Sequence, residues 1–186
     1  KLLDGRVGNI TIFKLFTPES RLEKYEVLNV IIHKELGLIA PRTALIDVQI
    51  GGQIFKAIFQ EDITKELLEY NNFHESLIIE GDEGYVPLTN PRIVNTNLIK
   101  SSYMNTIAKE ILRTLGKVFL NTNKLKVVHV LYDFPLAIDF LPEESKDNFI
   151  LFHLLNFSLN TSAGLSTDDH RIIYDLISKK FYPIFY

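Results

Sequence analysis

Apolar and polar residues alternate along two strand-like runs within residues 38–62. Period-two spacing predicts that one face of the first run turns toward a core, with the other face in a wetter place; the apolar face holds Ala44, Ile46, Val48 and Ile50. Gly51 and Gly52 separate the runs and predict a two-residue hairpin, because both turn positions need a positive φ. The second run ends in the polar residues Gln60-Glu61-Asp62. We expect any function to attach to this hairpin and to the helix before it.

A helical period precedes the hairpin between residues 20 and 36. Ser20 with Glu23 fits a capping box at its start, and Gly37 suits the residue just past its end. The stripe expected to be buried consists of Leu22, Tyr25, Leu28, Ile32 and Leu36. Upstream, residues 10–16 predict a strand on which Lys14 shares a face with apolar residues. Such a lysine either reaches solvent at a sheet edge or meets an anion inside.

The second half of the chain predicts a mainly helical lobe. One helix is expected from about residue 101, with Gly116 ending or bending it. Its buried face is expected to hold Met104, Ile107, Ala108, Ile111, Leu112 and Leu115. Residues 145–159 are apolar on all sides, which predicts a helix at the centre of this lobe. Strands are expected at residues 171–176 and 181–185.

Shorter segments join these elements. A short helix at residues 65–70 and an extended run at 77–80 follow the hairpin. Residues 85–100 contain two prolines and predict a loop between two lobes, which we place at 1–84 and 85–186. Helix and strand are both possible for the β-branched run at 125–134.

Composition excludes several classes of protein. The 20 basic and 23 acidic side chains give a net charge of −3, without the basic surplus typical of nucleic-acid binding. No run approaches the roughly 20 uncharged apolar residues of a membrane span. Cysteine is absent, so disulfide scaffolds and thiolate metal sites are excluded. The chain starts at Lys1 and stops within a predicted strand, so we expect a fragment of a longer protein, truncated within its second lobe.

Motifs of hydrolases and P-loop nucleotide-binding proteins are also missing, and the five histidines lack metal-ligand spacing. What remains is a set of polar residues beside turns: Lys14, Glu26, Glu35, Gln60, Glu61 and the loop Asp168-Asp169-His170-Arg171. Taken separately, a residue of this kind is more often ordinary surface than part of a site. Together they place a cation with a carboxylate on the first lobe and a carboxylate loop on the second. That combination suits a nucleotide with Mg²⁺, which prefers carboxylate and phosphate oxygens.

Residues 20–61 predict a helix ending in Leu-Gly, then Ala-Pro-Arg, a strand, a Gly-Gly turn and a strand ending in Gln-Glu. A second stretch consists of residues 166–175, followed by Phe181-Tyr182-Pro183-Ile184. In these two stretches, about half of its length, the chain resembles the CotH-type (spore coat protein H-like) atypical protein kinase family. The resemblance implies an α+β, atypical protein-kinase-like fold: a small antiparallel-sheet lobe with one helix, plus a mainly helical lobe.

The resemblance also implies an activity and residue roles. It implies binding of ATP and Mg²⁺, and transfer of phosphate to a protein Ser/Thr hydroxyl. By position, Lys14 would hold phosphates, with Glu26 or Glu35 as its helix partner. Gln60 and Glu61 would lie near the adenine, and Asp169, with Arg171 in the same loop, would be the catalytic metal ligand.

Two departures keep an alternative open. Asp168-Asp169-His170 replaces the family's His-Asn-Arg order, and a further metal ligand expected after the last strand lies beyond Tyr186. The alternative is a catalytically inactive, kinase-like binding or structural module for a protein partner.

Overall fold

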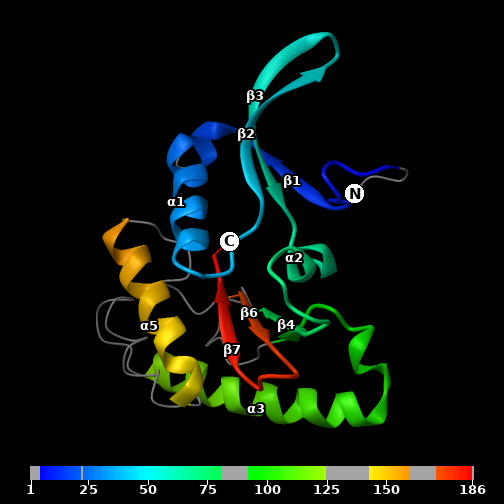
Figure 1. Ribbon diagram of the computed structural model, residues 1–186, viewed down its shortest axis with the longest axis vertical. Helices are drawn as coiled ribbons and strands as arrows, with labels where there is room; N and C mark the ends of the chain where they lie inside the picture. The colour runs from blue at the N-terminus through cyan, green and yellow to red at the C-terminus, as the bar shows by residue number, and fades with distance from the viewer. Residues whose placement is uncertain (1–4, 22, 81–91, 125–142, 160–170, 186) are drawn as a thin grey trace. The chain divides into compact units, whose positions relative to one another are not determined.

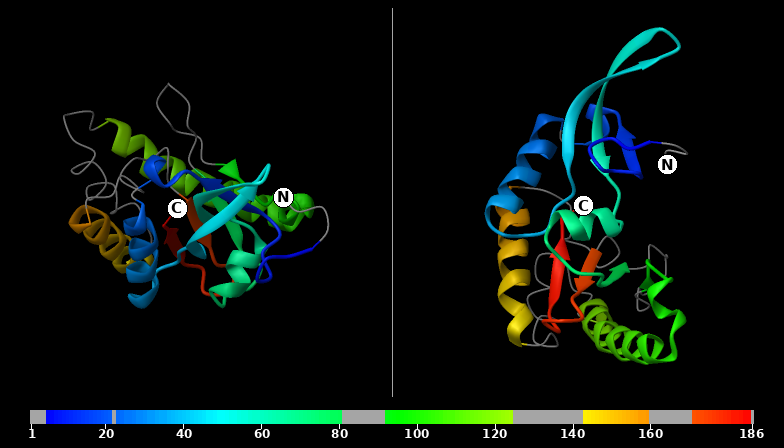
Figure 2. Two further views of the ribbon diagram at one scale, coloured as in Figure 1. Left: turned by 90° about the horizontal axis from the view of Figure 1, so that it is seen from above. Right: turned by 45° about the vertical axis from the view of Figure 1, so that its right-hand side comes forward.

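The computed structural model describes residues 5–21, 23–80, 92–124, 143–159 and 171–185 of the 186. The fold is α+β, and every strand pair within it is antiparallel. The chain divides into two compact units, Lys1–Phe73 and His74–Tyr186, which are described one at a time (Figures 1 and 2). No helix among these described residues is long and apolar enough to cross a membrane.

Unit 1 is built on a three-stranded sheet with the order β1-β3-β2. Its strands are β1 (Phe13–Phe16), β2 (Thr43–Ile50) and β3 (Gln53–Glu61). The helix α1 (Lys24–Glu35) packs against β2, and a short helix, α2 (Lys65–Tyr70), follows β3. The predicted hairpin is confirmed, since Gly51 and Gly52 have φ values of 58° and 84° between β2 and β3.

Burial along the hairpin follows the predicted alternation only in part. Ile46 and Val48 are half-buried as expected, whereas Ala44 and Ile50 are exposed. The hairpin tip extends beyond the rest of the sheet (Figure 1), so its residues have no second layer to cover them. The four residues from Ile58 to Glu61, at the base of β3, are all buried.

The buried stripe predicted for α1 is wrong. Residues Tyr25, Leu28 and Leu36 are exposed, Ile32 is half-buried, and Leu22 lies outside the described residues. The buried residues of α1 are Glu26, Asn29, Val30 and His33. The helix therefore turns a largely polar face inward, which the apolar period alone could not reveal.

The two ends of α1 differ in how well the sequence predicted them. The capping box is wrong, because Pro18–Ser20 forms a 3₁₀ turn and α1 begins only at Lys24, after Glu23 with φ of 50°. The C-terminal end is confirmed. Gly37 has φ of 78°, and the N–H groups of Gly37 and Leu38 donate to the carbonyls of Lys34 and His33, a Schellman motif.

Unit 2 contains a four-stranded sheet with the order β5-β4-β6-β7. Among its described residues, those in helices still outnumber those in strands, as expected for a mainly helical lobe. Its strands are β4 (Leu77–Glu80), β5 (Arg92–Ile93), β6 (Arg171–Tyr174) and β7 (Phe181–Ile184). The strand β4 pairs with β5 and β6, so it belongs to unit 2, whereas we had placed residues 77–80 in the first lobe. A 3₁₀ turn, Leu98–Lys100, precedes the helices of this unit.

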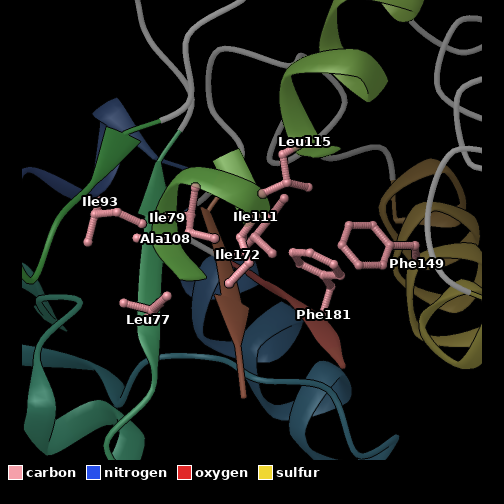
Figure 3. Packing of buried hydrophobic residues seen from close by; sticks show 9 residues of the cluster. All are labelled: Leu77, Ile79, Ile93, Ala108, Ile111, Leu115, Phe149, Ile172 and Phe181. Carbon is pink, nitrogen blue, oxygen red and sulfur yellow. The ribbon is translucent and has the colours of Figure 1, made fainter. Parts of the chain in front are cut away.

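The helices of unit 2 are α3 (Ser102–Lys124) and α5 (Glu143–Ser158). Ala108, Ile111 and Leu115 on α3 are buried as predicted, and the helix continues through Gly116 instead of ending there. The core cluster in Figure 3 joins α3 and α5 to the sheet through Leu77, Ile79, Ile93, Ala108, Ile111, Leu115, Phe149, Ile172 and Phe181.

The prediction that the helix at residues 145–159 is buried at the centre of its lobe is wrong. Ile150 and Leu154 on α5 are exposed, whereas Phe149 and Phe152 are buried. The run at residues 125–134, for which helix and strand were both open, lies outside the described residues.

Candidate functional site

Lys14 lies on β1, an edge strand of unit 1, directly opposite Gln60 of β3. Directly opposed residues of antiparallel strands project from the same face of a sheet, so Lys14 and Gln60 share a face. The Lys14 side chain is 46% exposed, and its Nζ lies 3.8 Å from Oδ1 of Asp62, whose side chain is 32% exposed. Of the two outcomes expected for this lysine, the structure shows the solvent-accessible edge position, with an acidic partner.

Glu26 lies on the buried face of α1 and is only 5% exposed. Its Oε1 accepts a hydrogen bond of 3.2 Å from Nε2 of Gln60. Burial raises the pKa of Glu26 above its ordinary value of 4.5, while Arg21 and the Gln60 hydrogen bond oppose the rise. Glu35, the other candidate carboxylate, is exposed at the last residue of α1, about two and a half turns away. Of the two glutamates, Glu26 is therefore the one that contacts the sheet.

Asn29 and His33 share the buried face of α1 with Glu26, and the sequence interpretation missed both. Their positions at i+3 and i+7 from Glu26 form a polar stripe, which was the available signal. His33 Nδ1 donates to the Asn29 carbonyl oxygen at 2.8 Å, and burial lowers the pKa of His33 despite this bond. Within the described residues, Asn29 Nδ2 and Gln60 Oε1 are buried without a hydrogen-bond partner. Buried polar atoms normally have such a partner, so these two atoms are exceptions in the described part of unit 1.

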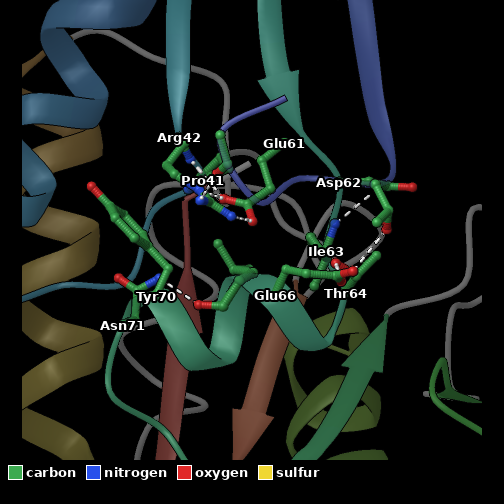
Figure 4. A network of polar contacts seen from close by, with 12 residues as sticks. Pro41, Arg42, Glu61, Asp62, Ile63, Thr64, Glu66, Tyr70 and Asn71 are labelled. Carbon is green, nitrogen blue, oxygen red and sulfur yellow. Dashed lines mark hydrogen bonds and ion pairs between the residues drawn. The ribbon is translucent and has the colours of Figure 1, made fainter. Parts of the chain in front are cut away.

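Glu61, expected near an adenine, is instead fully buried against Arg42 of the Ala-Pro-Arg segment (Figure 4). Oε2 of Glu61 accepts from Arg42 Nε at 2.8 Å and from the Arg42 backbone N–H at 3.1 Å, and Oε1 pairs with Nη2. Arg42 Nη1 also donates to the Gly8 carbonyl at 2.8 Å, and its guanidinium lies 4.6 Å from the Tyr70 ring centre. Both oxygens of Glu61 are thus engaged in holding the end of β3.

Glu66 on α2 forms a neighbouring polar contact that fixes the chain after β3. Its carboxylate accepts hydrogen bonds from Thr11 at 2.7 Å and from Thr64 at 2.6 Å. Burial acts to raise the pKa of Glu66, but the hydrogen bonds from Thr64 and Thr11 outweigh it and hold that pKa below its ordinary value. These contacts tie the first turn of α2 to the segment before β1.

In unit 2, Arg171 is the first residue of β6 and not part of a loop. It forms an ion pair with Glu80, its register partner on β4, and Glu80 also accepts hydrogen bonds from Arg92 at 2.9 and 3.1 Å. Asp169, the expected metal ligand, lies outside the described residues. Among the residues that the structure does describe, no group of three or more acidic or histidine side chains could hold a metal ion.

The geometry therefore divides the sequence-predicted residues into separate groups. Lys14, Gln60 and Glu26 lie on the α1-facing side of the unit 1 sheet, where a cation, an amide and a buried carboxylate occur together. Glu61 and Arg171 each take part in an ion pair that supports a strand. Comparison of the chain with protein-family models found no match, and comparison with curated proteins found none.

Proposed function

We propose that this chain is a CotH-like kinase domain that binds ATP with Mg²⁺ and transfers phosphate to a serine or threonine hydroxyl of a protein. One observation carries the proposal. A helix carboxylate, Glu26, is buried against β3, where it bonds the residue directly opposite Lys14. Burial of a glutamate is unfavourable unless the carboxylate is paired, so the presence of Glu26 at this buried position favours a role in the site.

Lys14 acts in this proposal as the cation for the nucleotide phosphates. In its pair with Asp62 the lysine is exposed and the aspartate is half-buried, and solvent-accessible pairs of this kind contribute about 0–1 kcal/mol. A phosphate group can therefore replace Asp62 as the partner of Lys14 at little loss of stability. Gln60 lies opposite Lys14 in the strand register and bonds Glu26, so it links the strand pair of the lysine to α1.

Phosphoryl transfer depends mainly on positioning and charge neutralisation. Mg²⁺ supplies positive charge to the phosphate oxygens, and Asp169 remains the proposed ligand for it. Glu61 with Arg42 serves a supporting role, since both Glu61 oxygens already bond the arginine.

The test measures melting temperature with and without ATP and MgCl₂. Ligand at 100 times its dissociation constant adds about 2.7 kcal/mol, and about 2–4 °C per kcal/mol is expected for a chain of this size. Lys14→Ala should abolish the shift. Lys56→Ala is the matched control, because Lys56 is also a strand lysine paired with an aspartate, Asp47, at 3.1 Å. Equal shifts for the two variants, or none for the wild type, would contradict nucleotide binding at Lys14.

A second pair of variants tests the helix carboxylate. Glu26→Gln should weaken the ATP-dependent shift, whereas Glu35→Gln, at an exposed position of the same helix, should leave it unchanged. Transfer of labelled γ-phosphate to a protein substrate then separates catalysis from binding.

The alternative is a catalytically inactive module that holds a protein partner. The exposed apolar hairpin tip favours it, because Ile50, Ile54 and Phe55 beside the Gly51-Gly52 turn are exposed. Under this alternative, ATP has no effect, Lys14→Ala retains partner binding, and Ile54→Ser loses it.

A further inference from the structure

A cavity of about 450 Å³ in unit 2 lies between α3, α5 and the strands β6 and β7. Its walls combine two carboxylates with aromatic rings. Glu110 and Tyr103 come from α3, Glu144 from α5, Tyr174 from β6 and Phe181 from β7. The side chains belong to four elements, so the polar and aromatic groups meet only in the folded unit. None of them takes part in the nucleotide site proposed above.

The electrostatic character of this cavity is negative. Of the described residues that line it, Lys179 is the only basic one, against the two glutamates. Among the described residues, neither Glu110 nor Glu144 forms an ion pair. Tyr174 lies close enough to these carboxylates to be affected by their negative charge. Burial raises the pKa of its phenol, and Glu110, Asp175 and Glu144 raise it further.

Apart from Thr114, the rest of the lining is apolar and aromatic. Ile107, Ile111 and Leu176 contribute aliphatic surface, and the rings of Tyr174 and Phe181 pack at an interplanar angle of 56° with centroids 4.9 Å apart. Tyr103 is 73% exposed, so its ring is accessible to a ligand. An aliphatic stem that ends in a planar cation matches this combination, because carboxylates bind the head group and aromatic faces attract it.

We propose that this cavity docks an arginine side chain of a partner protein, with its guanidinium between Glu110 and Glu144 and its stem on the apolar wall. An anionic ligand is disfavoured by the two carboxylates. A wholly apolar ligand would leave them desolvated and without counter-charge, which is unfavourable. This docking site does not depend on nucleotide binding at Lys14.

The test is an amide NMR titration of the full chain with the peptide acetyl-Leu-Arg-Leu-amide. The neutral control replaces arginine by citrulline, which keeps the shape and removes the charge. We expect saturable shifts confined to residues around 103–114 and 174–181 for the arginine peptide, and affinity at least about tenfold weaker for the citrulline peptide, since loss of a charge-assisted bidentate pair is of that size. Equal affinity for the two peptides would overturn the proposal, as would shifts elsewhere in the protein.

Variants separate the cavity from general surface charge. The double variant E110Q/E144Q should lose binding, whereas E143Q, one residue away on α5 and outside the lining, should retain it. K179Q should strengthen binding, because it removes the like charge from the lining. These glutamates are exposed, so the variants should melt with the wild type. Equal weakening by E143Q, or spermidine binding as tightly as the peptide, would refute docking of a partner's arginine.

Discussion

The buried ion pair between Arg42 and Glu61 allows a quantitative test of how unit 1 is held together. In Arg42→Ala, the fully buried Glu61 carboxylate keeps only the bond from the backbone N–H of residue 42. It loses the Nε bond of 2.8 Å and the Nη2 pair. The variant also loses the 2.8 Å bond to the Gly8 carbonyl and the contact with the Tyr70 ring.

Removing one partner of a buried ion pair destabilises a protein by about 3–5 kcal/mol, because the other charge stays buried without compensation. The Arg42 side chain is 21% exposed and one backbone bond survives, so we expect the lower end of that range, about 3 kcal/mol. The control is Lys56→Ala, which breaks a pair whose side chains are 68% and 63% exposed. That loss should lie at about 0–1 kcal/mol.

Native-state hydrogen exchange of the β3 amides is the suitable assay, since it measures the opening free energy of this strand residue by residue. Arg42→Ala should lower the opening free energy of these amides by the amount given above, and Lys56→Ala should barely change it. The double variant R42L/E61L should recover part of the loss, because no charge is left buried. If Arg42→Ala and Lys56→Ala have the same small effect, the pair does not hold β3 and the reasoning fails.

Three further results are expected. Burial raises the pKa of Glu26, so protonation of this carboxyl stabilises the fold. The stabilisation should be fully present below the ordinary pKa of 4.5 and be lost as pH rises through the raised pKa. Urea titrations of Glu26→Gln should lack this fall in the free energy of unfolding with rising pH. The pKa of His33 is lowered, so its effect on stability runs in the opposite direction with pH. The stabilisation should be present above 6.5 and be lost as pH falls through the lowered pKa. If the free energy of unfolding of His33→Gln changes with pH in the same way, this explanation is wrong. In unit 2, Leu115→Ala should lower the free energy of unfolding by about 2–5 kcal/mol, against less than about 0.5 for the exposed Leu154→Ala, as denaturant titrations can measure.

Local signals predicted the elements of this protein well where short-range geometry decides them. The Gly51-Gly52 turn and the Gly37 helix end both need positive φ, and both are found where the sequence placed them. The strands at residues 171–174 and 181–184 and the inner face of α3 follow the same logic, since alternation and helical spacing are properties of neighbouring residues.

Local sequence signals did not predict how the polar residues of the candidate site are paired. The sequence named Lys14, Glu26 and Gln60, but it could not choose between Glu26 and Glu35 or detect Asn29 and His33. It also could not predict that Glu61 is paired with Arg42, nineteen positions earlier in the chain. Register between strands brought that pair together, and register is a long-range property.

What the amino-acid sequence determined by itself is the set of local conformations: a Gly-Gly hairpin, a helix ended by glycine, and strands and helices of recognisable period. Only the tertiary structure decided which side of α1 is covered, because that helix has both an apolar stripe and a polar stripe and the partner surface selects between them. The polar side was selected, with Gln60 of β3 bonded to Glu26. The same holds for the four-stranded sheet of unit 2, since antiparallel pairing of β4 with β6 joins residues almost a hundred positions apart, and no local pattern encodes it.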